Sequence, residues 1–265
     1  MALDLIETYL AHLRESGCTD DTIKTYGWIL GKAHQALPCG LDVACDEELR
    51  TWLWRDGLKQ SSRATYYGAL NGFFGYHCDS GELDWNPMAD IRRPKVPRGV
   101  PRVGKDAEVQ LVLTQAAEPY RLWAKLAAYE GLRCVEIERL DREHITETTT
   151  MVHLGKGNKI RRLPTHRVVW CAVKDLPPGP ITDFDREDIS NRFKKACVRL
   201  GVPGLSMHRI RGWYCTTGYR ASKDLRAMQK AMGHANPATT VGYIDIPDDD
   251  VAAALSGLPT FGLTD

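Results

Sequence analysis

The chain has 265 residues, 43% of them hydrophobic and 26% charged, which suffices for one large domain or two small ones with separate cores. No apolar run approaches the roughly 20 residues that span a bilayer, and the N-terminus lacks the basic stretch of a secretion signal, so a cytosolic protein is the default expectation. The formal net charge of +1 by itself indicates no class of partner.

Four helices are predicted in the first part of the chain, over residues 3–16, 19–37, 46–57 and 61–81. Thr19 or Asp20 is a suitable N-cap for the second helix, Ser61 or Ser62 for the fourth, and Gly81 ends the fourth. Helices with such short connections form a small bundle, which the segment DWNPMADI then closes.

A basic linker follows the bundle. Residues 91–105 contain six basic residues, three prolines and no acidic residue. Proline-rich sequence between helical regions favours an extended segment, and its charge suits contact with DNA phosphates. A linker that is only solvated remains the alternative.

The rest of the chain is mainly helical with one small sheet. Thr, Val and Ile dominate residues 142–164, and GKGN separates two short strands there, which indicates an antiparallel hairpin. Helical patterns cover 106–117, 120–130, 133–140, 166–174, 186–200, 206–219 and 223–232, with a short helix at 247–257. The predicted fold class is therefore mainly α, with a four-helix bundle followed by an α+β domain.

The eight cysteines are widely and irregularly spaced and form no CxxC pair. Zinc sites and disulfide frameworks have recurring ligand or partner spacings that are absent here. We expect reduced thiols in a cytoplasmic protein.

Four clusters could carry chemistry, although each alone has an ordinary explanation. In GLRCVEIERL, residues 131–140, Arg133 and Glu136 share a helix face, as many surface pairs do. In LGKGNKIRR, Lys156 lies at a turn that is no P-loop, because GxxxxGK[ST] is absent, and a solvated turn lysine is the simpler interpretation.

The other two clusters are SMHRIRGWYCTTGY and GHANPATTVGY. His208 and Arg211 project from one face near the start of a helix, an arrangement that suits an anion. His234 and Tyr243 flank an Asn-Pro break, and Tyr243 alone would be taken for a packing residue.

Taken in order, the four clusters resemble the signature of the tyrosine recombinase (phage integrase) family: Arg, Lys, His-x-x-Arg, His or Trp, then Tyr. GLRCVEIERL resembles the box GLR-x-x-E-[IL]-x-x-L, GKGNKIRRLP resembles GKG-x-K-x-R-x-[VL]-P, and GHANPATTVGY resembles GH-x-x-x-x-TT-x-x-Y. The sequence departs from the family at Gly212, where a second histidine is usual. Because the chain begins almost at the first bundle helix, the resemblance is to a small integrase without an arm-binding domain.

The resemblance implies cleavage of DNA by transesterification. Tyr243 would attack the scissile phosphorus, leaving a 3′-phosphotyrosine link and a free 5′-hydroxyl. Arg133 and Arg211 would hold the non-bridging oxygens through charge-assisted bonds, so neither a metal nor another cofactor is expected. A phenol with a reference pKa of about 10 needs help to lose its proton.

The resemblance also assigns supporting roles. His208 would assist as general acid or base, Lys156 would protonate the departing 5′ oxygen, and His234 would donate a hydrogen bond to the phosphate. Glu136 would support the site from behind these groups.

The implied layout is a core-DNA-binding domain at 1–90, the linker at 91–105, and a catalytic domain at 106–265 whose segment 247–257 docks on a neighbouring subunit. The expected partner is double-stranded DNA with a core site of two inverted half-sites, bound by a homotetramer that is a monomer in solution, in the cytoplasm of a bacterial host. An accessory directionality protein is a conceivable further partner.

Because residues 1–95 hold 10 basic and 14 acidic side chains, any DNA-binding face there is local. The candidate phosphate contacts are Lys24, Lys59, Arg63, Arg92, Arg93 and Lys95.

Integration by a temperate phage is the first expectation, with a Xer-like or transposon recombinase as the alternative. A type IB topoisomerase-like enzyme shares nearly the same catalytic set and would relax supercoils without strand exchange. A DNA-binding module that has lost its chemistry is a third reading. If Tyr243 were not the nucleophile, Tyr214 or Tyr219 would be the next candidates.

Overall fold

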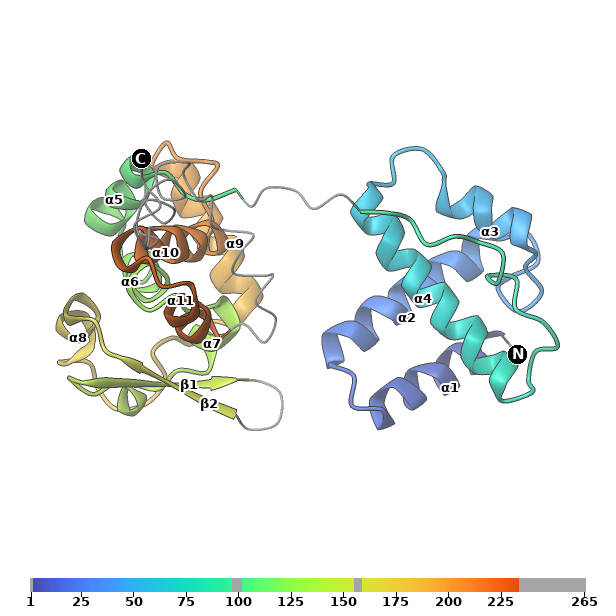
Figure 1. The fold of residues 1–265 in the computed structure, drawn as a ribbon, viewed down its shortest axis with the longest axis horizontal. Helices are drawn as coiled ribbons and strands as arrows, with labels where there is room; N and C mark the ends of the chain where they lie inside the picture. Colours follow the sequence, from blue (N-terminus) through green and yellow to red (C-terminus); the bar gives the residue numbers. More distant parts are fainter. Residues whose placement is uncertain (1, 97–101, 155–158, 234–265) are drawn as a thin grey trace, which may run out of the picture. The chain divides into compact units, whose positions relative to one another are not determined.

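The computed structural model describes residues 2–96, 102–154 and 159–233. The chain divides into two compact units, residues 1–98 and 99–265, each with its own hydrophobic core (Figure 1). The division falls inside the basic segment 91–105, whose described residues belong to no helix or strand.

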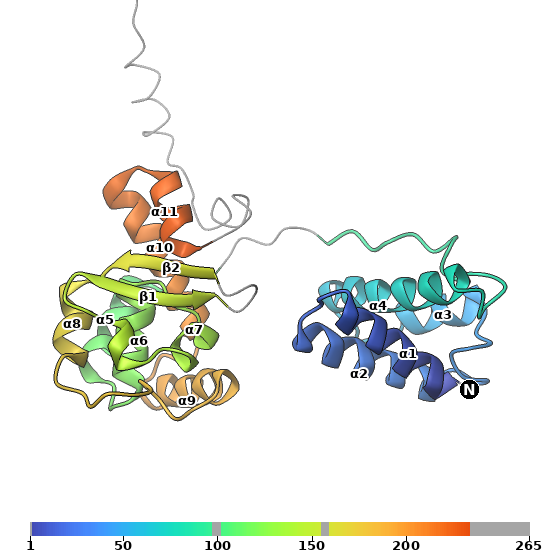
Figure 2. The same ribbon diagram turned by 90° about the horizontal axis from the view of Figure 1, so that it is seen from below.

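The N-terminal unit is a bundle in which the longest helix packs against the other three (Figure 2). Its helices are α1 (Ala2–Glu15), α2 (Asp20–Ala36), α3 (Asp46–Leu53) and α4 (Gln60–Asp79). As predicted, the Thr19 hydroxyl caps α2 by accepting a hydrogen bond from the Thr22 N–H at 3.4 Å, and Gly81, just after α4, has the positive φ of a helix stop. Met88 and Ile91 complete the core, so the segment after α4 does close the unit.

The predicted cap of α4 at Ser61 or Ser62 is wrong. The helix begins at Gln60, and its N-cap residue, Lys59, makes no side-chain cap hydrogen bond. The first helical hydrogen bond, from the Arg63 N–H to the Lys59 carbonyl oxygen at 2.9 Å, already encloses both serines. The Arg63 guanidinium also donates to the carbonyl oxygens of Leu53 and Leu58 at 2.8 and 3.3 Å, which ties the α3–α4 connection to the first turn of α4.

The C-terminal unit is built around one almost wholly buried helix, α6 (Tyr120–Tyr129), which packs against α5, α8, α9 and α10. Its sequence YRLWAKLAAY is apolar on most sides, as expected for a central helix. The remaining elements are α5 (Asp106–Gln115), α7 (Cys134–Glu138), a 3-10 turn η1 (Arg142–His144), β1 (Thr149–Leu154), β2 (Lys159–Pro164), α8 (Arg167–Val173), α9 (Arg186–Arg199), α10 (Met207–Ser222) and α11 (Leu225–Met232).

The two strands form an antiparallel hairpin at the edge of this unit (Figure 1). The register pairs Thr150 with Leu163 and Val152 with Arg161, and all four residues are buried. One face of the hairpin therefore packs on the core, and that face includes an arginine.

The fold class predicted from the sequence is confirmed: the described residues are mainly helical with one small antiparallel sheet. All eight cysteines are free thiols. Within the described ranges, no helix has the length and apolar character to span a membrane. The predicted helix at 247–257 and the GKGN turn lie outside the described residues.

Candidate active site

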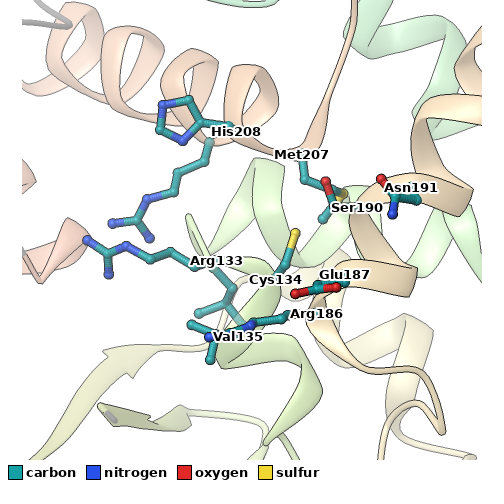
Figure 3. A pocket seen from close by; sticks show the side chains of 11 residues that line it. Arg133, Cys134, Val135, Arg186, Glu187, Ser190, Asn191, Met207 and His208 are labelled. Atoms are coloured by element: carbon teal, nitrogen blue, oxygen red, sulfur yellow. The ribbon is translucent and has the colours of Figure 1, made fainter. Parts of the chain in front are cut away.

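A pocket of about 580 Å³ opens between the start of α7, the first turns of α9 and the start of α10 (Figure 3). Arg133, His208 and Arg211 line it together with residues of α9. In Figure 3 the His208 and Arg133 side chains reach toward the same side of the pocket, whereas Ser190 and Asn191 come from α9 on the other side. The pocket thus brings Arg133, at the start of α7, together with His208 and Arg211 of α10.

The backbone before α7 has a conformation that requires glycine. Gly131 has a φ of +63°, and a Cβ placed there would lie 2.6 Å from the Tyr214 ring. Glycine is therefore needed both for the positive φ and for the close approach of α10. This turn sets Arg133 as the N-cap residue of α7, at the mouth of the pocket.

The start of α10 places His208 and Arg211 one turn apart. Ser206 caps the helix by accepting a hydrogen bond from the Arg209 N–H at 3.3 Å, and the Arg209 guanidinium points away to the Gly204 carbonyl. The i, i+3 spacing then directs His208 and Arg211 into the pocket, as the sequence predicted.

Glu136 lies behind the pocket and is almost fully buried, with 3% of its surface exposed. Its Oε1 accepts from Arg133 Nη1 at 2.8 Å, and its Oε2 accepts from the Arg133 backbone N–H at 2.8 Å. The same Oε2 also accepts from Arg161 Nη2 at 3.2 Å and from Arg211 Nη1 at 3.5 Å. One carboxylate therefore binds three guanidinium groups. The cluster of Glu136 with Arg133, Arg161 and Arg211 has a formal charge of +2.

Arg211 is held mainly by backbone carbonyl groups. Its Nη1 donates to the Gly131 oxygen and its Nη2 to the Met232 oxygen, the latter at 2.6 Å. The side chain is only 3% exposed, yet it lines the pocket. The guanidinium is thus fixed by α6–α7 on one side and by the end of α11 on the other.

The electrostatic surroundings act on His208 and on Tyr214. Although His208 is one of the more exposed pocket residues, partial desolvation of its ring lowers its pKa, and the charges of Arg211 and Arg133 lower it further. Burial raises the pKa of Tyr214 above its usual value, although Arg161 opposes this shift. Tyr214 therefore loses its phenolic proton less readily than an ordinary tyrosine.

Another buried acid lies near this cluster. Burial raises the pKa of Glu130 to about 7, although a hydrogen bond from Thr150 and the charge of Arg161 lower it. Glu130 does not line the pocket. It is a titratable group close to the site that the sequence did not indicate.

The structure brings Arg133, His208 and Arg211 together with Glu136 behind them. The other predicted catalytic residues, Lys156, His234 and Tyr243, lie outside the described residues. Of the predicted phosphate contacts in the N-terminal unit, Arg63 is engaged by the carbonyl groups of Leu53 and Leu58. The others are exposed: Lys24, Lys59, Arg92, Arg93 and Lys95.

Sequence reasoning missed two features of the site. One is the α9 wall of the pocket, which contributes Arg186, Glu187, Ser190 and Asn191. The other is Arg161, which joins Glu136 from β2. The hairpin box did contain this arginine, but nothing in the sequence paired it with a carboxylate far along the chain.

The amino-acid sequence also matches known proteins. The profile of the phage integrase family matches residues 181–249. The tyrosine recombinase XerC of Serratia marcescens is 30% identical over 226 residues, which cover 77% of this chain and 74% of the relative.

Solved structures show a similar fold. A lambda integrase dimer bound to a COC′ core site has a TM-score of 0.76 at 18% identity, covering 91% of this chain and 76% of the other. A lambda integrase tetramer bound to a Holliday junction has a TM-score of 0.74 at 17% identity, covering 88% and 77%. These structures show the fold, whereas the XerC relative and the family profile confirm the family that the ordered motifs indicated: the chain belongs to the tyrosine recombinases of the phage integrase family, enzymes that cleave and rejoin DNA strands.

Proposed function

We propose that the chain is a site-specific recombinase that cuts and rejoins double-stranded DNA through a 3′-phosphotyrosine intermediate at Tyr243. The observation that carries the proposal is the pocket in which Arg133, Arg211 and His208 converge over the buried Glu136. Two guanidinium groups beside an imidazole suit a phosphodiester, because such an anion gains further negative charge when it is attacked.

The proposed reaction exchanges one ester for another. The Tyr243 oxygen forms a bond to phosphorus while the bond from phosphorus to the 5′ oxygen breaks. His208 takes the phenolic proton, Lys156 gives a proton to the departing 5′ oxygen, and His234 donates a hydrogen bond to the phosphate. Because the phosphotyrosine ester retains the bond energy, the reverse reaction rejoins the strands without ATP.

Arg133 and Arg211 contribute in different ways to this reaction. Arg211 is anchored by two carbonyl groups, so it need not reorganise when charge develops on the phosphate. Arg133 is more accessible, with 37% of its side chain exposed, and can close on the anion from the pocket mouth. Together they provide the bidentate geometry that a lysine could not.

The biological reaction we propose is phage integration and excision at a core site of two inverted half-sites, by a tetramer on DNA. The XerC relatives support the alternative of a Xer-like recombinase. The recombination products separate the two: integration joins two different sites into two hybrid sites, whereas a Xer-like reaction joins two copies of one site.

The test is to trap the covalent complex on a library of nicked duplexes, sequence the attached DNA, and map the modified peptide by mass spectrometry. We expect a 3′-phosphate on Tyr243 and a recurring core sequence. A modified Tyr214 or Tyr219 would overturn the assignment of the nucleophile. Supercoil relaxation on many sequences without strand exchange would support a topoisomerase instead.

The lowered pKa of His208 predicts a particular pH dependence. A proton acceptor must be neutral, so cleavage is present above the pKa of His208 and is lost as pH falls through it. Because burial and the two arginines lower that pKa below its usual 6.5, we expect the single-turnover rate at subsaturating DNA to hold at pH 6.5 and to fall only under more acidic conditions.

The fall of the cleavage rate at low pH is the acid limb of the pH profile, and the His208→Asn variant tests whether His208 causes it. We expect a slower enzyme whose cleavage rate no longer falls in that range. Glu130→Gln is the control, since Glu130 titrates near neutrality yet does not line the pocket, and we expect it to keep the limb. Loss of the limb in Glu130→Gln and its persistence in His208→Asn would contradict the assignment.

A further inference from the structure

Arg161 occupies an unusual position for a charged residue. It lies on the inward face of β2, paired with Val152 and two residues before Leu163. Only 7% of its surface is exposed, and it does not line the pocket. Burial lowers the pKa of Arg161, and the Glu136 carboxylate opposes this shift, so the guanidinium remains charged within the core.

The hydrogen bonds of Arg161 are incomplete. Its Nη2 donates to Glu136 Oε2 at 3.2 Å, whereas its buried Nε and Nη1 have no hydrogen-bond partner in the described part of the chain. A Cβ at Gly233 would lie 2.5 Å from Nη1, so the guanidinium packs directly against the end of α11. Buried donors without partners are rare and costly, which indicates that something other than stability keeps this arginine.

The sharing of Glu136 Oε2 shows what Arg161 can do. Arg161 and Arg211 approach this oxygen from β2 and α10, at 3.2 and 3.5 Å. Of the four contacts that the carboxylate makes with described residues, the one with Arg211 is the longest. Without Arg161, Arg211 would be the only one of these two arginines to bind Oε2, and the carboxylate would form a tight ion pair with Arg211. Arg211 would then offer less charge to an anion in the pocket.

We propose that Arg161 is a positioning residue that holds Glu136 away from Arg211 and so keeps the Arg211 guanidinium available to the scissile phosphate. It also keeps the cluster at a formal charge of +2, whereas its loss would leave +1. Arg161 does not line the pocket, so its proposed effect on the phosphate passes through Glu136 and Arg211. The inference rests on the proposed function, in which the pocket binds a phosphodiester.

The test compares Arg161→Met, which keeps the bulk and removes the charge, with wild type and with Arg162→Met. Arg162 is the neighbouring arginine of the same strand, exposed on the opposite face, and serves as the matched control. Two quantities are measured: the dissociation constant for a core-site duplex and the single-turnover cleavage rate on saturating duplex. Arg161→Lys, which keeps the charge but loses the fork, is measured in parallel.

We expect Arg161→Met to bind the duplex as wild type does and to cleave it about tenfold more slowly or worse, since an Arg211 paired tightly with Glu136 offers less charge to the transition state. Arg161→Lys should give an intermediate rate and Arg162→Met the wild-type rate. A wild-type rate in both Arg161 variants overturns the proposal, as does a parallel loss of binding and cleavage. If Arg161→Met fails to fold, the rate of Arg161→Lys decides in the same way.

A second arm uses inorganic phosphate and needs no DNA. Phosphate that binds the pocket raises the thermal unfolding midpoint, and the concentration dependence gives its affinity. We expect weaker phosphate binding in Arg161→Met than in wild type, and equal affinity would overturn the role of Arg161. If wild type does not cleave DNA at all, the proposed function fails, and this arm alone decides the inference.

Discussion

An Arg211→Ala variant is expected to bind its DNA site with nearly wild-type affinity and to cleave it at least about a thousandfold more slowly. DNA binding by such proteins is spread over many phosphate contacts, so one buried arginine contributes little to it. Cleavage depends on the charge that develops at one phosphate, and Arg211 is the least exposed arginine that lines the pocket. The loss should therefore fall on the rate and not on affinity.

Substituting lysine should not restore this function. The Arg211 guanidinium donates to the Gly131 and Met232 carbonyl groups and still faces the pocket. A lysine ammonium is one point of charge on a flexible chain and cannot reproduce that fork. We expect Arg211→Lys to remain at least about a hundredfold slower than wild type.

The measurement is a single-turnover cleavage assay with a nicked core-site duplex, combined with fluorescence anisotropy for binding. Arg209→Ala is the matched control, because Arg209 lies on the same helix and points away to Gly204. It should cleave as wild type does. An Arg211→Ala variant that loses binding and cleavage equally would show that Arg211 serves DNA affinity instead of the transition state.

Much of the fold followed from local patterns. The helices of both units have apolar residues at helical spacing, and the two strands lie in the segment that is rich in Thr, Val and Ile. The pair His208 and Arg211 could be placed together because i, i+3 residues share a helix face. Arg133 could be placed with Glu136 for the same reason, and the structure shows that contact at 2.8 Å.

The contacts between distant segments could not be predicted in this way. Arg161 and Arg211 are 25 and 75 residues from Glu136 along the chain. The sequence does not show which arginines form ion pairs with Glu136, because these pairs depend on how β2, α7 and α10 pack. Arg63 illustrates the same limit: as a basic residue in the bundle it suggested a phosphate contact, but its guanidinium holds the α3–α4 connection.

A Glu136→Ala variant should destabilise the C-terminal unit by about 3–5 kcal/mol, the usual cost of removing one partner from a buried ion pair. Arg161 and Arg211 have side chains only 6% and 3% exposed, so water cannot screen their mutual repulsion once the carboxylate is gone. Arg133 is more exposed and should contribute less. Thermal or urea unfolding, followed by a signal from the C-terminal unit, measures the change.

Glu138→Ala on the same short helix is the control for this variant, since Glu138 is only half-buried, and it should leave the unfolding midpoint close to that of wild type.

The Glu136→Gln variant separates the charge of Glu136 from its role as a hydrogen-bond acceptor. Its amide oxygen can still accept a hydrogen bond, but its NH₂ group meets guanidinium donors and it brings no negative charge. If charge compensation is the main role of Glu136, Glu136→Gln should be destabilised nearly as much as Glu136→Ala. A Glu136→Gln variant as stable as wild type would show that the carboxylate acts only as a hydrogen-bond acceptor.

The same reasoning predicts that an anion can partly replace Glu136. In Glu136→Ala the three arginines would lose the carboxylate that they share, so inorganic phosphate bound in the pocket would neutralise charge that Glu136 no longer neutralises. We therefore expect phosphate to raise the unfolding midpoint of Glu136→Ala by more than it raises that of wild type. Sodium chloride at matched ionic strength controls for general screening. An equal rise in the two proteins would mean that the pocket anion and Glu136 do not share the same arginines, which would contradict the coupling between the buried carboxylate and the proposed phosphate site.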